Sequence, residues 1–580
     1  MTFNKYYQDE LLYLRELGRE FSTAHPEAAG FLAEPGSDPD VERLIEGFAF
    51  LTARVREKLD DELPELTHAL MEMFWPHYLR PVPSITTLQF DAMAQAAKES
   101  RTIASGAEID SVPVDGTPCR FRSVYDVNLQ PITLQGVELR RGSPPVLALK
   151  FKFADGITAA KANISSLRLH LAGETAVSRA LYLCLTRYFT RAVAQPLTPP
   201  GQGVSLDAKT SPVGFAGNEA MLAYPNASFS GFRLLQEYFI YPAKFMYVEL
   251  TGLQGLSKLG AATHFELQLQ LSRLVENMPP VSAGNVLLNC TPAINLFKHD
   301  ADPIRVDLQR TEYFVRPSGS DGRHFEIYSI DRVAGMPRGT NRLREYRPLF
   351  RLSSRPEPDA VFYRARIHPA VTGEGTNVMI SLTGGMHNIQ TPEIETLSIE
   401  LSCTNRNLPT KLGLGDVSVT TSNAPNFARA KNITRPTASI APPMGDDLHW
   451  RLLSHLSLNY LSLIDLESLR SLIGLYNFRA RVDRQAENAH RLMLAALEKI
   501  SARPAIRLVQ GAPVRGMEVE LEVGEDGFGG EGEAYLFGSV LSEFLAQYVS
   551  LNAFSRLSLK GTKYGEVHTW PARSGKRTLL

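Results

Sequence analysis

The stretch Gly524–Val549, GEDGFGGEGEAYLFGSVLSEFLAQYV, joins a glycine-rich turn to a long apolar segment near the end of the chain. Within it, Gly527 to Gly532 reads G-x-G-x-x-G, with strand-like residues Met517 to Val523 before it and helix-like residues after it. This order is typical of dinucleotide-binding folds, in which backbone N–H groups cradle a pyrophosphate. The first question is therefore whether this loop binds a phosphate.

The charges around the loop argue against a phosphate site. Eight acidic residues lie between Glu518 and Glu543, and no Lys or Arg occurs between Arg515 and Arg556. A dinucleotide fingerprint also needs an acidic residue roughly 20 positions on, after a second strand. The second strand-like stretch, Ser555 to Lys560, has no Asp or Glu. We interpret the loop as a flexible turn whose acidic residues suit the helix N-terminus that follows, and a nucleotide-dependent enzyme stays the alternative.

The segment after the loop is apolar on nearly its whole circumference. Its apolar positions are Tyr535, Leu536, Phe537, Val540, Leu541, Phe544, Leu545, Tyr548, Val549 and Leu551. A helix of this kind must be covered on all sides, either in the core or between its own domain and a partner. The core is the commoner place, but Phe544 and Tyr548 also count as candidate interface residues.

Length and composition indicate an ordinary globular protein. A chain of 580 residues predicts roughly three or four domains. Its net charge of −1 creates no field that would recruit nucleic acid or a membrane surface. Four distant cysteines without C-x-x-C spacing give no support to zinc, and no signal peptide or apolar membrane span is found. We therefore expect a reduced, soluble, cytoplasmic protein.

The first 80 residues are patterned as helices and carry 16 acidic against 8 basic residues. We expect three helices, the second capped by Asp38 and the third ended by Pro76 and Pro81. Short amphipathic helices are not stable alone, so their apolar stripes must pack against another helix or another chain. The candidate interface residues in this region are Tyr7, Leu11, Leu14, Phe21, Leu44 and Phe48.

After Ser84 the apolar period changes to two, which predicts strands. The fold class that we predict is multidomain α+β, with an N-terminal helical segment, β-rich middle domains and a C-terminal mixed α/β region. The expected domains are residues 1–83, helical; 84–210, β-rich; 211–425, β-rich with short helices; and 426–580, α+β. The polar, proline-containing residues 422–447 read as a linker, and Pro425 to Pro443 as a candidate hinge.

The sequence contains few groups of residues that are typical of catalytic or metal sites. His68, Glu72 and His77 are four and then five residues apart, and Pro76 disrupts that helical face. His299, Asp300 and Asp302 read as a solvated turn more readily than as a metal site. The chain has no P-loop, no G-x-S-x-G elbow and no H-E-x-x-H. We expect an assembly component rather than an enzyme, without cofactor or metal, and a ligand-binding β-domain protein is a second alternative.

Five stretches, in order along the chain, resemble one known family. They are YYQDELLYLRELGREFSTAHPEAAGFL, residues 6–32; DPDVERLIEGFAFLTARVREKLDDELPELTHALMEMFWPHYLRPVPS, residues 38–84; FRLLQEYFIYPAKF, residues 232–245; LNCTPAINLF, residues 288–297; and YLFGSVLSEFLAQYVSLNAFSRL, residues 535–557. They resemble the TssF family, baseplate subunits of the bacterial type VI secretion system.

This resemblance implies a structural role. TssF proteins look like wedge proteins of contractile phage tail baseplates. Two copies are expected to assemble with one TssG, TssK trimers attach to them, and TssE joins near the sheath. Six wedges are expected around the spike hub, at the inner face of the cell envelope. No catalytic activity, cofactor, nucleic acid or direct membrane insertion is implied.

Overall fold

A computed structural model describes most of the chain. The described residues are 6–8, 10–15, 17, 39–74, 76–93, 98–222, 224, 230–307, 310–319, 324–337, 343–349, 361–369, 375–383, 395–442, 464–509, 512–547, 549, 553–563 and 565–575. The chain divides into two compact units, one of residues 1–75 with 445–453 and one of residues 76–444 with 454–580. Several β-sheets and a set of helices confirm the predicted α+β class.

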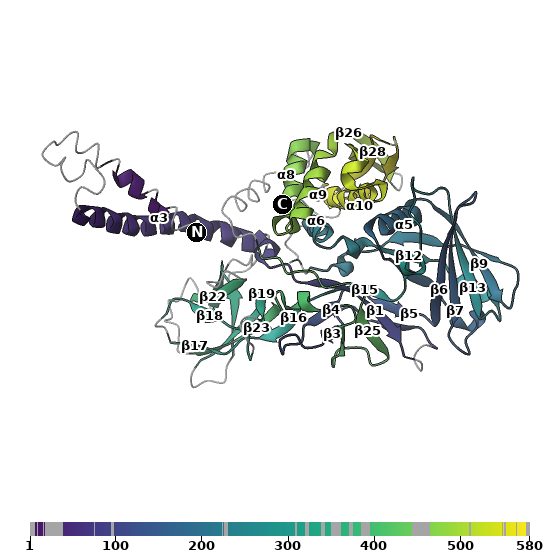
Figure 1. Ribbon diagram of the computed structural model, residues 1–580, viewed down its shortest axis with the longest axis horizontal. Helices are drawn as coiled ribbons and strands as arrows, with labels where there is room; N and C mark the ends of the chain where they lie inside the picture. The colour runs from purple at the N-terminus through teal and green to yellow at the C-terminus, as the bar shows by residue number, and fades with distance from the viewer. Residues whose placement is uncertain are drawn as a thin grey trace. The chain divides into compact units, whose positions relative to one another are not determined.

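The described residues of the first unit are helical. Residues 6–8, 10–15 and 17 are helical, and α3 runs over 36 residues, Pro39–Phe74 (Figure 1). The prediction of two separate helices after residue 38 is wrong, because α3 continues through Pro64. Proline removes one backbone donor from a helix interior, and here that loss does not end the helix. As predicted, α3 begins at Pro39 and ends before Pro76.

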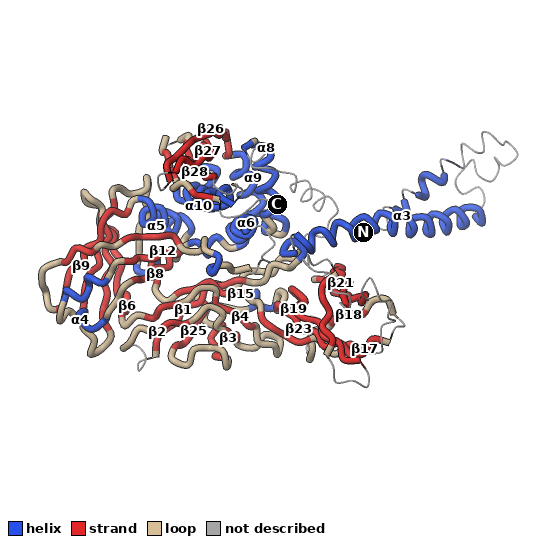
Figure 2. The backbone as a smooth tube through the Cα atoms, turned by 180° about the vertical axis from the view of Figure 1, so that it is seen from behind, coloured by secondary structure: helices blue, strands red, loops and turns tan. Residues whose placement is uncertain are grey.

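Among the described residues, the second unit contains six α-helices, one of them a single short turn, together with the strands. The helices are α4 (Ala159–Ala162), α5 (Thr175–Arg187), α6 (Ser230–Ile240), α8 (Leu466–Tyr476), α9 (Arg484–Ala495) and α10 (Glu531–Gln547). Figures 1 and 2 show α5, α6, α8, α9 and α10 gathered beside strands β26 (Leu497–Val509), β27 (Ala512–Val523) and β28 (Ala553–Gly561). Helices α8, α9 and α10 pack on the C-terminal sheet, and α5 and α6 pack against α10.

A six-stranded sheet joins segments that are far apart in the sequence. Its order is β24 (Val417–Thr420), β3 (Glu108–Ser111), β4 (Arg120–Ser123), β15 (Cys290–Ile294), β1 (Ile85–Ala92) and β25 (Ala428–Asn432). In antiparallel register, β1 pairs Ile85 with Ile294 and Leu88 with Asn432. Three of the four predicted domains therefore contribute strands to one sheet, and the four-domain division stays a prediction.

The predicted linker is wrong over residues 428–440. Its first part is β25, and the residues after it are held along β1: Thr434 Oγ1 accepts from the N–H of Thr87 at 2.9 Å, and Thr437 Oγ1 accepts from the N–H of Ile85 at 3.0 Å. Val82 and Ile440 exchange backbone hydrogen bonds at 2.8 and 3.0 Å. The segment forms a strand because it pairs with β1, whose residues lie some 340 positions earlier in the chain.

The remaining sheets fill the second unit. A five-stranded sheet runs β10 (Val204–Leu206), β9 (Phe189–Thr198), β13 (His264–Leu271), β7 (Val146–Phe153), β6 (Ile132–Arg140). A four-stranded sheet runs β11 (Lys209–Pro212), β12 (Tyr247–Thr251), β8 (Ser166–Leu171), β14 (Val286–Leu287), and β2 (Arg101–Ile103) pairs with β5 (Val127–Leu129). An eight-stranded sheet runs β16 (Phe297–Asp300), β23 (Glu395–Thr404), β19 (Glu326–Pro337), β20 (Arg344–Pro348), β21 (Val361–Pro369), β22 (Thr376–Thr383), β18 (Tyr313–Val315), with β17 (Ile304–Val306) on β23.

The C-terminal sheet contains the predicted strand, loop, helix and strand. Its order is β26, β27, β28 and β29 (Val567–Thr569), with β30 (Arg573–Ser574) on β28. Strands β27 and β28 are parallel, from Arg515 opposite Ala553 to Val523 opposite Gly561, and α10 connects them. A parallel pair needs such a crossover, and a helix apolar on all sides fits it because the sheet and other helices cover it.

A fully buried ion pair ties α6 to the short helix after it, Pro242–Phe245. The Lys244 ammonium donates to the Glu237 carboxylate, and neither side chain is exposed. The same carboxylate accepts from the N–H groups of Met221 and Leu222 at 2.8 and 3.0 Å. Burial lowers the pKa of Lys244, and the charge of Glu237 opposes that shift. This carboxylate therefore connects three segments of the second unit.

Removing the cation of this pair should destabilise the second unit strongly. For Lys244→Met we expect a loss of about 3–5 kcal/mol in the free energy of unfolding, because Glu237 is left as an uncompensated buried charge. Urea unfolding measures it. The double variant Glu237→Gln with Lys244→Met should recover most of the loss, since no buried charge remains. Equal losses in the single and double variants would contradict this account.

Candidate functional site

The first unit exposes large apolar side chains. Leu44, Phe48 and Leu51 are 74%, 60% and 63% exposed, and their spacing of four and three places them on one face of α3. Ala49 and Ala53, on the opposite face, are fully buried. Between Leu44 and Ala53, α3 thus buries these two small residues and leaves these three bulky ones uncovered. Contiguous exposed apolar side chains mark interaction sites in soluble proteins.

Helical residues before α3 add to this exposure. Leu12, Tyr13 and Leu17 are 60%, 57% and 41% exposed, and the Arg15 guanidinium pairs with Glu42 of α3. We name the set formed by Leu12, Tyr13, Leu17, Leu44, Phe48 and Leu51 the N-terminal apolar surface. It is the candidate functional site of this chain.

The structure places the predicted interface residues differently. Leu44 and Phe48 belong to the N-terminal apolar surface, whereas Tyr7, Leu11 and Leu14 are half-buried. Phe21 and Tyr548 lie outside the described residues. The predicted set omitted Leu51, although it continues the apolar stripe of Leu44 and Phe48 in the sequence. Spacing alone does not tell which residues of an apolar stripe are buried and which are exposed.

Phe544 is a core residue of the second unit. Its side chain is fully buried, and its ring lies 5.6 Å from that of Phe232 in α6. Nearly every described residue of α10 is buried in the same way. Of the two places that the sequence left open for this helix, the structure thus puts Phe544 inside its own chain, where a partner does not reach it.

The glycine loop before α10 is closed by its own chain. The N–H groups of Gly527, Gly529 and Gly530 donate to carbonyls of residues 524–526, so they do not point to a ligand. A Cβ at Gly527 would lie 2.4 Å from the Ala496 side chain, and one at Gly532 would lie 2.5 Å from the Arg179 carbonyl oxygen. These glycines permit close packing against α9 and α5. The loop does not have the open cradle that a dinucleotide needs.

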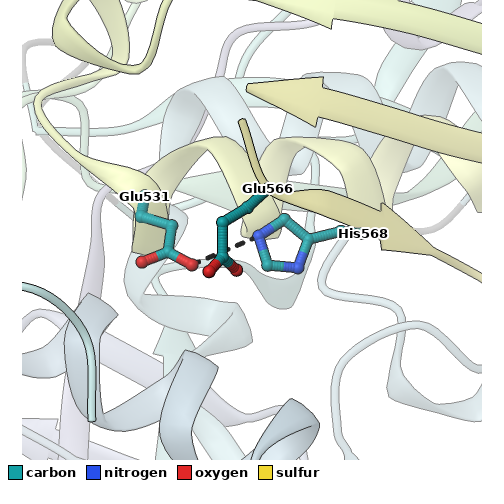
Figure 3. Close-up of side chains that lie close together, drawn as sticks. All are labelled: Glu531, Glu566 and His568. Carbon is teal, nitrogen blue, oxygen red and sulfur yellow. Dashed lines mark ion pairs between the residues drawn. The ribbon is translucent and has the colours of Figure 1, made fainter. Parts of the chain in front are cut away.

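A polar cluster holds the N-terminus of α10. Glu531, Glu566 and His568 lie together there, as Figure 3 shows, with His568 Nε2 3.4 Å from Glu531 Oε1. The Tyr188 hydroxyl donates to Glu531 at 2.7 Å, and the Arg273 guanidinium pairs with both carboxylates, at 3.0 Å from Glu531. Among the described residues this is the one group of three side chains with metal-ligand geometry.

The cluster is better explained as an internal anchor than as a metal site. Arg273 and Tyr188 already occupy the carboxylate oxygens that a cation would need. Burial raises the pKa of Glu531, but the contact with His568, the hydrogen bond from Tyr188 and the charge of Arg273 outweigh it and lower that pKa. The carboxylate is therefore charged and compensated. It fixes α10 to the residue between α5 and β9 and to the segments that follow β13 and β28.

The other predicted metal candidates have structural roles. His299 and Asp300 lie in β16 rather than in a turn, because that segment pairs with β23. His299 Nε2 is 2.9 Å from the Ser318 carbonyl oxygen, and its ring stacks on Phe325. His77 is buried and stacks on Tyr224, with ring centroids 3.7 Å apart.

Arg273 should be essential to the anchor. Replacing it with Met leaves two adjacent carboxylates without a cation, so we expect about 1–3 kcal/mol of destabilisation, moderated by the partial exposure of the arginine. Thermal unfolding measures the change. Arg273→Lys keeps the charge and should lose less. An unchanged unfolding temperature in Arg273→Met would show that the cluster contributes nothing.

His77 should make the fold sensitive to acid. Neither ring nitrogen has a hydrogen-bond partner, and burial, with a smaller contribution from the charge of Arg80, lowers the pKa of His77 well below 6.5. The folded chain therefore resists protonation of this ring, whereas the unfolded chain binds the proton below about pH 6.5. Stability is fully present above about pH 6.5 and falls as the pH drops below it.

The variant His77→Phe should remove this dependence. We expect its free energy of unfolding to fall less between pH 7 and pH 5 than that of the native chain, because no buried imidazole has to be protonated. Urea unfolding at both pH values measures it. His264→Gln, at a half-exposed position, is the matched control and should keep the native pH dependence. Parallel pH curves for His77→Phe and the native chain would refute the assignment.

Fold and site together define a multidomain α+β subunit built to join a larger assembly. A family model described as type VI secretion system, TssF matches residues 1–577. Type VI secretion system component TssF1 of Pseudomonas aeruginosa is 31% identical to the chain over 626 aligned positions, which cover 99% of each protein. The chain therefore belongs to the TssF family.

Solved structures agree with this. A chain of the TssK-TssF-TssG baseplate subcomplex of the type VI secretion system, determined by cryo-electron microscopy, matches with a TM-score of 0.77 and 32% identity over 93% of this chain and 99% of that one. A chain of a type VI secretion system baseplate complex matches over the full length of both, with a TM-score of 0.62 and 26% identity. The predicted family is confirmed, and its role is that of a structural baseplate component.

Proposed function

We propose that this chain is a wedge subunit of a type VI secretion baseplate, and that the N-terminal apolar surface binds TssG and a second copy of the chain. The observation that carries this is the inverted exposure of α3, with Leu44, Phe48 and Leu51 uncovered and Ala49 and Ala53 buried. A helix in that arrangement gains free energy only when another chain covers it.

We expect the interface to be large, as in a permanent assembly. Obligate interfaces bury more than about 2,000 Å² and resemble a domain core. Large aliphatic and aromatic side chains such as Phe48 and Tyr13 are the anchors that such interfaces use. The acidic excess of the first 80 residues favours a basic rim on the partner.

We base the proposed set of further partners on the family to which the chain belongs. The related structure contains TssK and TssG with TssF, and we propose the same two partners here. TssE and the spike hub complete the proposed set, at the inner face of the cell envelope. Among the described residues no helix is long and apolar enough to cross a membrane, which suits a subunit that reaches the envelope through other proteins. No catalytic step or cofactor is part of this function.

Charged substitutions on the N-terminal apolar surface should abolish binding to TssG. For Leu44→Asp with Phe48→Asp we expect loss of co-purification with co-expressed TssG, because each carboxylate would be buried without a partner in the interface. The pair Leu11→Asp with Leu14→Asp should do the same. In all variants the second unit should unfold at the native temperature, since the changes lie in the first unit.

A matched control is Leu414→Asp. Leu414 is 64% exposed, like Leu44 and Phe48, but lies in the second unit. It should leave co-purification unchanged. Native recovery of TssG by the Leu44 and Phe48 variant would overturn the assignment of this surface.

A further inference from the structure

The two-stranded ribbon β26–β27 extends past the sheet that it belongs to. In β27, pairing with β28 begins at Arg515 opposite Ala553, so among the described residues Ala512 to Val514 pair with β26 alone. Facing pairs in antiparallel register place Ile506 beside Arg515 and Leu508 beside Pro513. Since side chains alternate between faces, Ile506 and Leu508 share a face with Val519 and Leu521.

That face is covered at one end and bare at the other. Val519 and Leu521 are 1% and 0% exposed, in the part of the sheet on which α8 and α10 pack. Ile506 and Leu508 are 69% and 77% exposed. The apolar face therefore continues beyond the helical layer that covers it. Leu508 has the highest exposure of any large hydrophobic side chain among the described residues.

The bare end is positively charged. From Arg503 to Arg515 the sequence has three arginines and no Asp or Glu. Arg507 is 3.0 Å from Glu518 on the opposite face. Arg515 is exposed beside Ile506, on the apolar face itself. An occupant of this face must therefore bring both apolar side chains and acidic groups, which rules out a second copy of the same arginine-bearing ribbon.

The occupant is better accommodated on the face than at the edge. β26 is the edge strand of the sheet, and Pro504 lies within it, so an added strand would meet a residue without an N–H group. The face, in contrast, is covered by helices wherever it is buried within the chain. A helix packs on a sheet face by an apolar stripe and can carry acidic residues along its margin.

We propose that the ribbon surface formed by Ile506, Leu508 and Arg515 is a second docking surface, occupied by an acid-rimmed amphipathic helix of another baseplate subunit. The surface is separate from the N-terminal apolar surface, which lies in the other unit of the chain. The inference rests on the proposed function only in that the partner is a baseplate protein.

Site-specific photo-crosslinking in the assembled baseplate tests the proposal. The chain carries p-benzoylphenylalanine at position 508, and the matched control carries it at position 567, since Val567 is 52% exposed on the same sheet. We expect about tenfold more adduct at position 508, because the centre of an interface is packed against its partner. Mass spectrometry should place the adduct in an amphipathic, acidic helical segment of another subunit.

Charge variants sharpen the test. Arg515→Glu should reduce the adduct at position 508 about tenfold by placing like charges together, whereas Arg515→Lys should keep it. Yields equal to those at position 567 would overturn the proposal, as would an adduct with a second copy of the chain or with a segment that is not acidic. Co-purification with TssG through the N-terminal apolar surface is measured in the same preparations. It should be native in the Arg515 variants, so failure of one surface is distinguishable from failure of the other.

Discussion

The burial of α10 is the constraint on which the second unit depends. A helix with Leu, Phe, Tyr and Val on every side has no stable place in water, so sheet and helices must enclose it completely. Close approach makes this possible: the Trp570 ring occupies the space where a Cβ of Gly538 would lie, and its indole N–H donates to Ser539 at 3.1 Å. The enclosure brings α5, α6 and β28 into one body.

Because α10 is enclosed, the acidic side chains at its start need cations and hydrogen-bond donors from the chain itself. Glu531 and Glu533 suit the positive end of the helix, but burial deprives them of water. Arg179 and Tyr238 pair with Glu533, and Arg273 and Tyr188 pair with Glu531. The cations come from segments some 260–350 residues earlier in the chain. The acidic residues that follow the glycine-rich loop thus stabilise the packing of α10 within the second unit.

The two units solve the problem of apolar surface in different ways. The second unit covers most of its own, although the ribbon beyond α8 and α10 and separate side chains such as Leu414 are exposed. The first unit leaves bulky side chains of α3 uncovered, which is unfavourable for an isolated protein and favourable for a subunit. A wedge that must join several partners gains from this division, since one unit supplies a stable body and exposed surfaces supply the contacts.

The sequence by itself determined local structure, the α+β class and the family. It determined that α3 begins at Pro39 and ends before Pro76, and that α10 is buried on all sides, because capping and apolar periodicity are properties of neighbouring residues. Only the tertiary structure decided that residues 428–440 lie beside β1, that Phe544 is internal and that Leu51 is exposed. Strand pairing and burial depend on residues hundreds of positions away. A local sequence pattern does not determine which of these distant residues pack against a given segment.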